Sequence, residues 1–327
     1  MKKTASLLAN IGKVLLLPGF VYLFFFSVSS GKFGNASSII MILQQTLAPT
    51  LISLAMCSNM ICGRIDLSAG SIVMLSAMLG ARLVNTAQID VPVFAAVCIG
   101  SGLVLGIISV FLYLKMKVPA IVTALGICMI YEMLSNLSSI SWVTAISGES
   151  TVLGRMPVNF IIFAAMFVLF YVIFNYSKFG YNVRAIGNGQ NIARYSGINV
   201  KRNAFICYTL SGFFLGIAAL LKISIQGSID TAMYMSSTNI IFNCMLGIYI
   251  GLAIEKYCNL VIGILVGNII MNMMASGLLS IGLSASLQDV ASGLVLLVIM
   301  MFTCNNHRVL AFLERRKMRR DIISPGV

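Results

Sequence analysis

About ten apolar stretches, each close to the length of a membrane-spanning helix, follow one another along this chain of 327 residues. A helix needs about 20 residues to cross the hydrocarbon core of a bilayer. Hydrophobic residues make up 59% of the chain and charged residues only 9%, whereas a soluble domain carries about 25% charged residues. Too few charges remain to cover a water-facing surface, which excludes a freely soluble enzyme and a disordered chain. The sequence predicts an all-α, polytopic membrane helical bundle.

The expected spans are bounded by charged or turn-forming residues. They are residues 14–30, 39–61, 66–85, 93–114, 119–140, 158–176, 204–224, 238–255, 259–281 and 288–304. Only the run Cys62-Gly-Arg-Ile65 separates the second stretch from the third. The third is therefore a candidate for a re-entrant or broken element, and an inverted repeat with broken helices is compatible with this pattern.

The basic residues fall mostly on one side of the membrane when the N-terminus is placed in the cytoplasm. Of the 22 Lys and Arg residues, 18 then lie in cytoplasmic segments. The four on the outer side are Lys32, Arg82, Arg155 and Lys222. Because Lys and Arg concentrate in cytoplasmic loops, this distribution predicts an even number of spans and two cytoplasmic termini.

Ten spans leave room only for short loops and tails, so we expect one transmembrane domain covering residues 1–327. Its cytoplasmic parts are the N-terminus 1–13, a long loop at 177–203 and a basic tail at 305–327. We expect the tail to lie against anionic lipid headgroups of the membrane rather than on nucleic acid.

Motifs for covalent chemistry are missing. The eight cysteines lie in or beside apolar stretches without a C-x-x-C pair, and His307 is the only histidine. Neither pattern predicts a metal centre or a catalytic cluster. The sequence also lacks the G-x-x-x-x-G-K-[ST] loop that cradles nucleotide phosphates. We therefore expect a non-catalytic chain without a cofactor, and any ATP that drives it to be bound by a partner.

Glycine pairs four residues apart occur within the spans. They are Gly102/Gly106, Gly212/Gly216, Gly247/Gly251 and Gly263/Gly267. Such pairs let helix backbones approach closely in lipid. We interpret them as packing sites, with hinges or pore walls as the alternative.

Glu132 and Asp66 are acidic residues within or beside apolar stretches, and an ionised carboxylate at the bilayer centre costs about 2.5–3.5 kcal/mol. Glu132 either packs by hydrogen bonding to a neighbouring helix or contributes to a transport path. Asp66 or Ser68 can cap a helix start, and Arg64 is near enough in sequence to pair with Asp66. The same cluster, with Gly70 and Ser71, also has the composition of a broken helix at a transport site.

Polar amides recur in the later spans. They are Asn239, Asn243, Asn268, Asn272 and Gln288. Each can simply join two helices. Together they can line a path for a hydroxyl-rich solute, for which Asn243 and Asn272 are the candidates.

The loop at 177–203 is polar, basic and too long for a simple connection. Asn188 or Asn191 can cap a short helix that runs to about Ser196, and Gly197 can end it. Ala193 is small enough for a neighbouring protein to approach. The segment is either a docking site for a cytosolic subunit or a solvated positive loop.

Three motifs carry a family resemblance. Gly63-Arg-Ile-Asp-Leu-Ser-Ala-Gly-Ser71 is similar to G-G-I-D-L-S-V-G-S, and Lys117-Val-Pro-Ala-Ile-Val-Thr-Ala-Leu-Gly126 to K-V-P-x-F-I-x-T-L-G. Phe179 to Gly187 and Ala193 to Val200 follow F-G-x-x-x-x-A-I-G … A-x-x-S-G-I-x-V. Over about residues 35–304 the chain resembles the permease subunit of bacterial ATP-binding-cassette importers of the ribose/simple-sugar type.

The resemblance implies a dimer of permeases, made with a second copy or a paralogue, in the bacterial cytoplasmic membrane. Two ATPase modules would dock on the long loop, and an extracytoplasmic solute-binding protein would deliver the solute. The implied coupling residues are Ala185, Ile186, Gly187, Asn188, Ala193, Ser196, Gly197 and Ile198. The implied neighbours of the path are Asp66, Ser68, Gly70 and Ser71.

One region departs from the family pattern. An acidic start and a glycine-rich loop usually follow the seventh span, but here the glycine-rich loop is absent from Ser228 to Asn239 and from Asn243 to Gly251. The departure favours pairing with a different permease chain.

The function expected from this sequence is import of a sugar or related hydroxylated solute, driven by a separate ATPase. The alternative is an ion-driven secondary transporter that uses Glu132 and Asp66 as proton or sodium sites.

Overall fold

The computed structural model describes residues 14, 17–29, 33–87, 89–116, 118–139, 143–146, 148–231 and 233–282, together with 287, 290, 291, 293 and 294. Most of the tenth expected span, 288–304, lies outside these residues. So do the N-terminal segment 1–13, the basic tail 305–327, Lys32 and His307.

Seven helices of the described chain are long and apolar enough to cross a membrane. They are α2 (Ala36–Ile61), α3 (Ala69–Ala87), α4 (Val91–Met116), α5 (Ala120–Ser138), α6 (Val158–Tyr176), α9 (Val200–Gln226) and α11 (Leu260–Ser280). Two shorter apolar helices, Leu17–Val28 and α10 (Thr238–Ile254), correspond to two more expected spans. The predicted helical membrane bundle is therefore confirmed.

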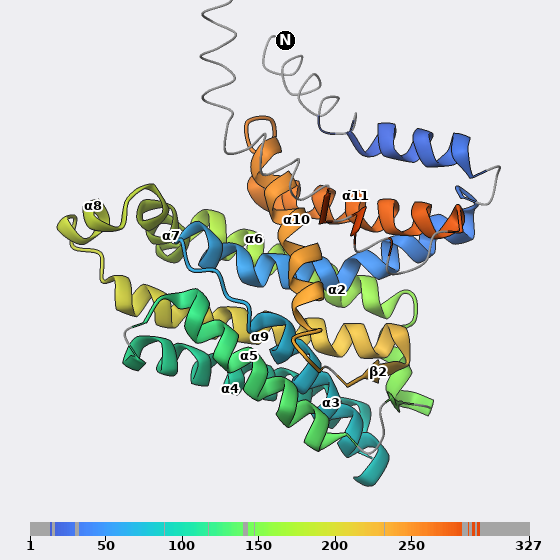
Figure 1. The fold of residues 1–327 in the computed structure, drawn as a ribbon, viewed down its shortest axis with the longest axis horizontal. Coiled ribbons are helices and arrows are strands. Elements are labelled where there is room, and N and C mark those ends of the chain that lie inside the picture. The colour runs from blue at the N-terminus through green and yellow to red at the C-terminus, as the bar shows by residue number, and fades with distance from the viewer. Residues whose placement is uncertain are drawn as a thin grey trace, which may run out of the picture.

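Connecting elements gather at two opposite ends of the bundle (Figure 1). At one end lie α7 (Lys178–Asn188) and α8 (Gln190–Tyr195). Near the other end, β1 (Val143–Ala145) pairs antiparallel with β2 (Ser228–Asp230), with the 3-10 helix η1 (Gly148–Gly154) following β1. We call these the α8 end and the β2 end. By the predicted topology, the α8 end is cytoplasmic.

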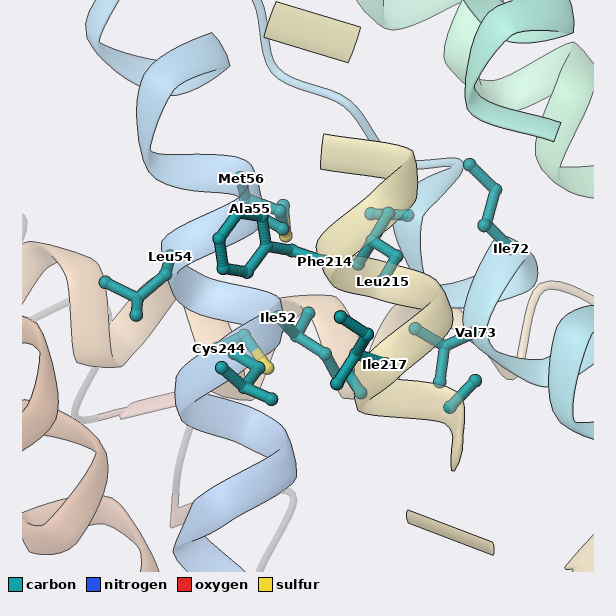
Figure 2. Packing of buried hydrophobic residues seen from close by; sticks show 14 of the residues in the cluster. Ile52, Leu54, Ala55, Met56, Ile72, Val73, Phe214, Leu215, Ile217 and Cys244 are labelled. Atoms are coloured by element: carbon teal, nitrogen blue, oxygen red, sulfur yellow. The ribbon is translucent and has the colours of Figure 1, made fainter. Parts of the chain in front are cut away.

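Helix α9 lies at the centre of the bundle and packs against α4, α2 and α3. Its Phe214, Leu215 and Ile217 contribute to the main apolar core together with Ile52 of α2 and Val73 of α3 (Figure 2). A helix that is apolar on every side is typical of such a central position. The core fixes where α2, α3 and α9 stand, and these helices carry the polar groups described below.

The chain breaks between α2 and α3, as the sequence suggested. Gly63 has φ +73°, a left-handed conformation that glycine adopts without steric cost, and it lies just beyond the end of α2. The connection then runs into the bundle, so that α3 starts at the buried Ala69 (Figure 1). The start of α3 is therefore inside the protein rather than at a membrane surface.

The glycine pairs bring two pairs of helices into close contact. A Cβ atom on Gly102 of α4 would lie 2.6 Å from the Cα atom of Gly216 on α9. Gly106 of α4 faces Gly212 of α9 in the same way. On the other pair, α10 and α11 meet through Gly247 and Gly251 against Gly263 and Gly267. The packing interpretation is thereby confirmed for all four pairs.

Replacing Gly102 with alanine is expected to lower the stability of the fold by about 1–3 kcal/mol, because the added methyl group forces α4 away from α9. Gly100→Ala is the matched control, since a Cβ atom there meets nothing within 4 Å. Thermal unfolding in detergent should show a lower Tm for Gly102→Ala alone. Equal Tm values for both variants would contradict the close packing.

Candidate translocation path and coupling site

A cavity of about 670 Å³ lies between α2, α9, α10 and α11. Its polar lining residues are Gln44, Gln45, Lys222, Gln226, Asn243, Asn268, Asn272 and Ser276. Gln44 and Gln45 belong to the first half of α2, and Gln226 ends α9. The cavity therefore lies toward the β2 end. Its volume falls within the usual range of about 300–1,000 Å³ for small-molecule sites.

Two predicted path residues, Asn243 and Asn272, both line this cavity. Asn272 donates a hydrogen bond from Nδ2 to the carbonyl oxygen of Asn268 at 2.9 Å. Asn239 is exposed and is not among the lining residues, and Gln288 lies outside the described residues. The structure thus brings together side chains from α10 and α11 that are far apart in the sequence.

One polar network joins three walls of the cavity. Asn268 of α11 donates to Ser53 Oγ at 3.0 Å and to the carbonyl oxygen of Ile264 at 2.9 Å. Ser53 of α2 lies 2.9 Å from the carbonyl oxygen of Cys244 on α10. Cys244 and Ile52 both line the cavity and belong to the main apolar core (Figure 2). Sequence reasoning missed Ser53, since its partners lie about 190–215 residues away.

Lys222 places a positive charge on the cavity wall. Its Nζ atom lies 3.7 Å from the sulfur of Met74, and it stands one turn before the end of α9. The sequence placed this lysine on the outer side of the membrane without giving it a role. The wall of the cavity therefore combines uncharged amides with a single cation among the described lining residues.

Asp66 caps the start of α3. Its Oδ1 accepts hydrogen bonds from the Ser68 backbone N–H at 3.0 Å and from the Ser68 hydroxyl at 2.5 Å. Ser71 Oγ in turn donates to the Ser68 carbonyl oxygen at 2.8 Å. Asp66, Ser68, Gly70 and Ser71 are all buried and do not line the 670 Å³ cavity. Their hydrogen bonds stabilise the break between α2 and α3, which lies beside the cavity.

Pairing of Arg64 with Asp66, which the sequence suggested, is not what the structure shows. The Nη2 atom of Arg64 donates to Asn203 Oδ1 at 3.0 Å, while the Asp66 carboxylate is bonded to Ser68. The break in the chain directs the two side chains toward different neighbours.

Glu132 holds the turn that precedes α10. Although it is only 3% exposed, its carboxylate accepts from the backbone N–H of Met235 at 2.7 Å, the backbone N–H of Ser237 at 2.9 Å and the Ser237 hydroxyl at 2.5 Å. Tyr234 and Met235 have φ +53° and +62°, a left-handed conformation that is costly for residues with a Cβ. These hydrogen bonds help to fix that turn, so the packing interpretation of Glu132 is confirmed.

The starts of α3 and α10 meet inside the bundle, each beside its own carboxylate. A Cβ atom on Gly70 would collide with the backbone of Ser237, so only glycine allows this approach. Negative charge stabilises the N-terminal end of a helix, where backbone N–H groups lack partners. Asp66 accepts a hydrogen bond from the Ser68 backbone N–H just before α3, and Glu132 accepts one from the Ser237 backbone N–H just before α10.

This arrangement does not favour an ion-driven transporter. Both carboxylates are already bonded to hydroxyl and backbone N–H groups, and neither lines the cavity. They are suited to holding helix ends in place rather than to exchanging ions along a path.

The loop at the α8 end forms two helices rather than one. Helix α7 begins after Ser177, whose hydroxyl accepts from the Gly180 N–H. Helix α8 begins after Gly189 without a side-chain cap, so the predicted caps Asn188 and Asn191 are wrong. The predicted end is confirmed, because Ser196 follows the last residue of α8 and Gly197 has φ +83°.

Three of the eight predicted coupling residues pack toward the protein interior. Ile186 and Ala193 pack with Val200 in a small apolar cluster, and Ile198 lies against it. Ala193 is therefore not available to a neighbouring protein. Of the other predicted residues, Gly187, Asn188, Ser196 and Gly197 are exposed, and Ala185 is half-buried.

Two residues that sequence reasoning missed dominate the exposed side of α8. Ile192 is 70% exposed and Tyr195 is 92% exposed. They are three positions apart and so share one face of the helix, opposite the buried Ala193. An apolar pair at helical spacing within a polar loop is the sequence signal that could have identified them.

Comparison with known proteins identifies the group to which this architecture belongs. Residues 38–300 match the family model described as the branched-chain amino acid transport system / permease component. The chain is a member of this permease family. No solved structure matches it.

The permease is similar to several characterised import permeases. It is 27% identical over 283 residues to the galactose/methyl galactoside import permease protein MglC of Escherichia coli (strain K12), a match that covers 78% of this chain and 83% of the relative. It is 28% identical over 286 residues to the ribose import permease protein RbsC of Haemophilus influenzae, covering 83% and 86%. The fructose import permease protein FrcC of Rhizobium meliloti is 26% identical over 287 residues, covering 83% and 79%. The permease is thus a multi-pass protein of the bacterial cytoplasmic membrane.

Proposed function

We propose that this permease is the membrane subunit of an ATP-binding-cassette importer that carries a sugar or a related small hydroxylated solute. The observation that carries the proposal is the amide-lined cavity of about 670 Å³ in a chain whose relatives include galactose, ribose and fructose import permeases. Amide groups both donate and accept hydrogen bonds, which suits the many hydroxyls of a sugar. A cavity wall of α2, α9, α10 and α11 surrounds the solute.

The energy for transport comes from a separate ATPase in this proposal. The exposed face of α8, with Ile192 and Tyr195, is the docking surface for that subunit. Closure of two ATPase modules on ATP then moves α7 and α8, and through them α9. A solute-binding protein delivers the sugar at the β2 end, and a second permease copy or a paralogue completes the path.

Reconstitution tests this function directly. The permease is reconstituted into proteoliposomes together with the ATPase and the solute-binding protein that co-purify with it. These proteoliposomes should accumulate radiolabelled galactose, ribose or fructose only when ATP is present on the side of the membrane that carries the ATPase. Solute accumulation driven by a proton or sodium gradient in liposomes that contain the permease alone would contradict the proposal.

Removal of two cavity amides tests the path itself. Asn243→Leu together with Asn272→Leu is expected to reduce ATP-dependent uptake at least about tenfold, because each lost hydrogen-bonding partner costs about 1–3 kcal/mol. Asn136→Leu is the control, since Asn136 lies on α5 away from the cavity. ATP hydrolysis by the complex, measured in parallel, shows whether assembly persists. Unchanged uptake in the double variant would show that Asn243 and Asn272 do not contribute to the translocation path.

A further inference from the structure

A buried arginine at the α8 end has no carboxylate partner in the part of the chain that the structure describes. Arg64 is only 5% exposed, and its Nε atom has no hydrogen-bonding partner. Its hydrogen bonds run from Nη2 to Asn203 Oδ1 at 3.0 Å and to the Cys207 sulfur at 3.8 Å, both of them uncharged. Arginine does not lose its proton in proteins, and a buried charge is costly unless it is paired. Its other neighbour is the Cys62 thiol, whose pKa is lowered to about 7 by the hydrogen bond to Cys207 and by the charge of Arg64. Among the described residues Arg64 meets no carboxylate, and its Nε donor remains available to an anion.

The space beside Arg64 is a small basic pocket, which we call the α8 pocket. It has a volume of about 280 Å³ and lies between the ends of α4, α8 and α9. Its nine lining residues include Arg64, Tyr113, Gln190, Arg194 and Lys201. Three of them are cations and none is acidic. The three cations come from the α2–α3 break, α8 and the first turn of α9.

The innermost cation is a feature of this chain. In the motif that runs from Gly63 to Ser71, Arg64 occupies the position at which the similar family motif G-G-I-D-L-S-V-G-S has its second glycine. The α8 pocket is therefore not implied by the resemblance. A glycine at residue 64 would leave the pocket without its buried charge.

We propose that the α8 pocket binds the phosphate group of an anionic phospholipid headgroup. Basic pockets between membrane helices on the cytoplasmic side are suited to such headgroups. Phe111 and Met116, within one turn of Tyr113 on α4, are large exposed apolar residues, and they offer a surface for the acyl chains. The volume of about 280 Å³ lies below the usual range for small-molecule sites of about 300–1,000 Å³, which favours a headgroup over a nucleotide.

A phosphate in this pocket joins three parts of the permease. The guanidinium groups of Arg64 and Arg194 can each donate two hydrogen bonds to phosphate oxygens, and Lys201 contributes a point charge. The lipid would thereby hold α8 on the start of α9, beneath the docking face of Ile192 and Tyr195. This proposal concerns lipid binding and does not depend on the solute or on the energy source of transport.

Lipid binding by the purified permease in neutral detergent tests the proposal. Native mass spectrometry should show retention of phosphatidylglycerol in preference to phosphatidylcholine. In Arg194→Gln/Lys201→Gln, the affinity for phosphatidylglycerol should fall about tenfold or more, since each cation near a headgroup contributes about 1 kcal/mol. Lys178→Gln/Arg202→Gln removes two exposed cations outside the pocket and should bind as the parent does.

Arg64→Gly, which restores the residue of the family motif, should also weaken binding of phosphatidylglycerol, and retention of full affinity would overturn the role of Arg64. Equal binding of the two lipids, or an equal loss in the control variant, would overturn the pocket as a headgroup site. Binding of inorganic phosphate that depends on the same residues, without binding of phosphatidylglycerol, would overturn the lipid source. Unchanged lipid binding with loss of the co-purifying ATPase in Arg194→Gln/Lys201→Gln would instead assign the pocket to a protein contact.

Discussion

Ile192→Asp combined with Tyr195→Asp is expected to weaken docking of the ATPase by about 30-fold or more and to abolish most ATP-dependent uptake. The two side chains are 70% and 92% exposed on one face of α8, so their replacement leaves the packing of the permease intact. Exposed apolar and aromatic anchors often contribute 2 kcal/mol or more to a protein interface, and 1.4 kcal/mol corresponds to a tenfold change in affinity. Co-purification of the ATPase and uptake in proteoliposomes are the two measurements.

The matched control for this variant is Tyr176→Asp. Tyr176 is a large exposed residue at the end of α6, outside α8. The Tyr176→Asp permease should retain both co-purification of the ATPase and ATP-dependent uptake. Full uptake in the α8 double variant would show that the ATPase docks elsewhere. Loss of ATPase co-purification and of uptake in the Tyr176→Asp control would show a general effect of added negative charge at the α8 end.

Glu132→Gln is expected to destabilise the permease by about 1–3 kcal/mol and to reduce transport strongly. The carboxylate accepts hydrogen bonds from Met235 N–H on one oxygen and from Ser237 N–H and Oγ on the other. Glutamine replaces one acceptor oxygen by an NH2 group, which then faces a donor. At least one buried donor loses its partner, and such a loss costs about 1–3 kcal/mol. The left-handed turn at Tyr234 and Met235 then loses part of its support.

Thermal unfolding in detergent and uptake in proteoliposomes measure this effect. Glu255→Gln is the control, because Glu255 is exposed at the end of α10 and undergoes the same chemical change. A stable Glu132→Gln permease with full uptake would show that the turn before α10 does not need the carboxylate. An equal decrease of Tm in the Glu132→Gln and Glu255→Gln variants would show that the effect does not come from the hydrogen bonds between Glu132 and the turn before α10.

The positions of the helices along the chain could be predicted from hydropathy alone. Seven expected spans appear as long helices and two more as shorter ones, because backbone hydrogen bonds must be satisfied within each segment in lipid. The break before α3 was also visible in the sequence, since Gly63 and the polar residues after it interrupt an apolar run. Local composition is enough for these features.

Which helices meet could not be predicted from composition. The spacing of Gly102 and Gly106 indicated close packing, but only the structure pairs them with Gly216 and Gly212 of α9. Similarly, Glu132 was recognised as a buried acid, but its donors lie 103 and 105 residues further on. Nothing in either segment specifies the other.

The direction in which side chains point was the main source of error in the coupling segment. The sequence placed Ala193 on the docking surface, whereas it packs inward with Ile186 and Val200. Helix α8 has only six residues, too few for a clear periodic pattern. Its inward face is fixed by contact with the start of α9.

The sequence by itself determined that this chain is a helical membrane protein, where its helices lie and which connecting segment is polar and basic, because each of these depends on the transfer of nearby residues from water to lipid. Only the tertiary structure decided that Asn243 and Asn272 share a cavity, that Asp66 and Glu132 hold the turns before two helix starts that meet, and that Arg64 is buried without a carboxylate partner among the described residues. Those features depend on contacts between residues far apart in the chain, which form only when the helices pack.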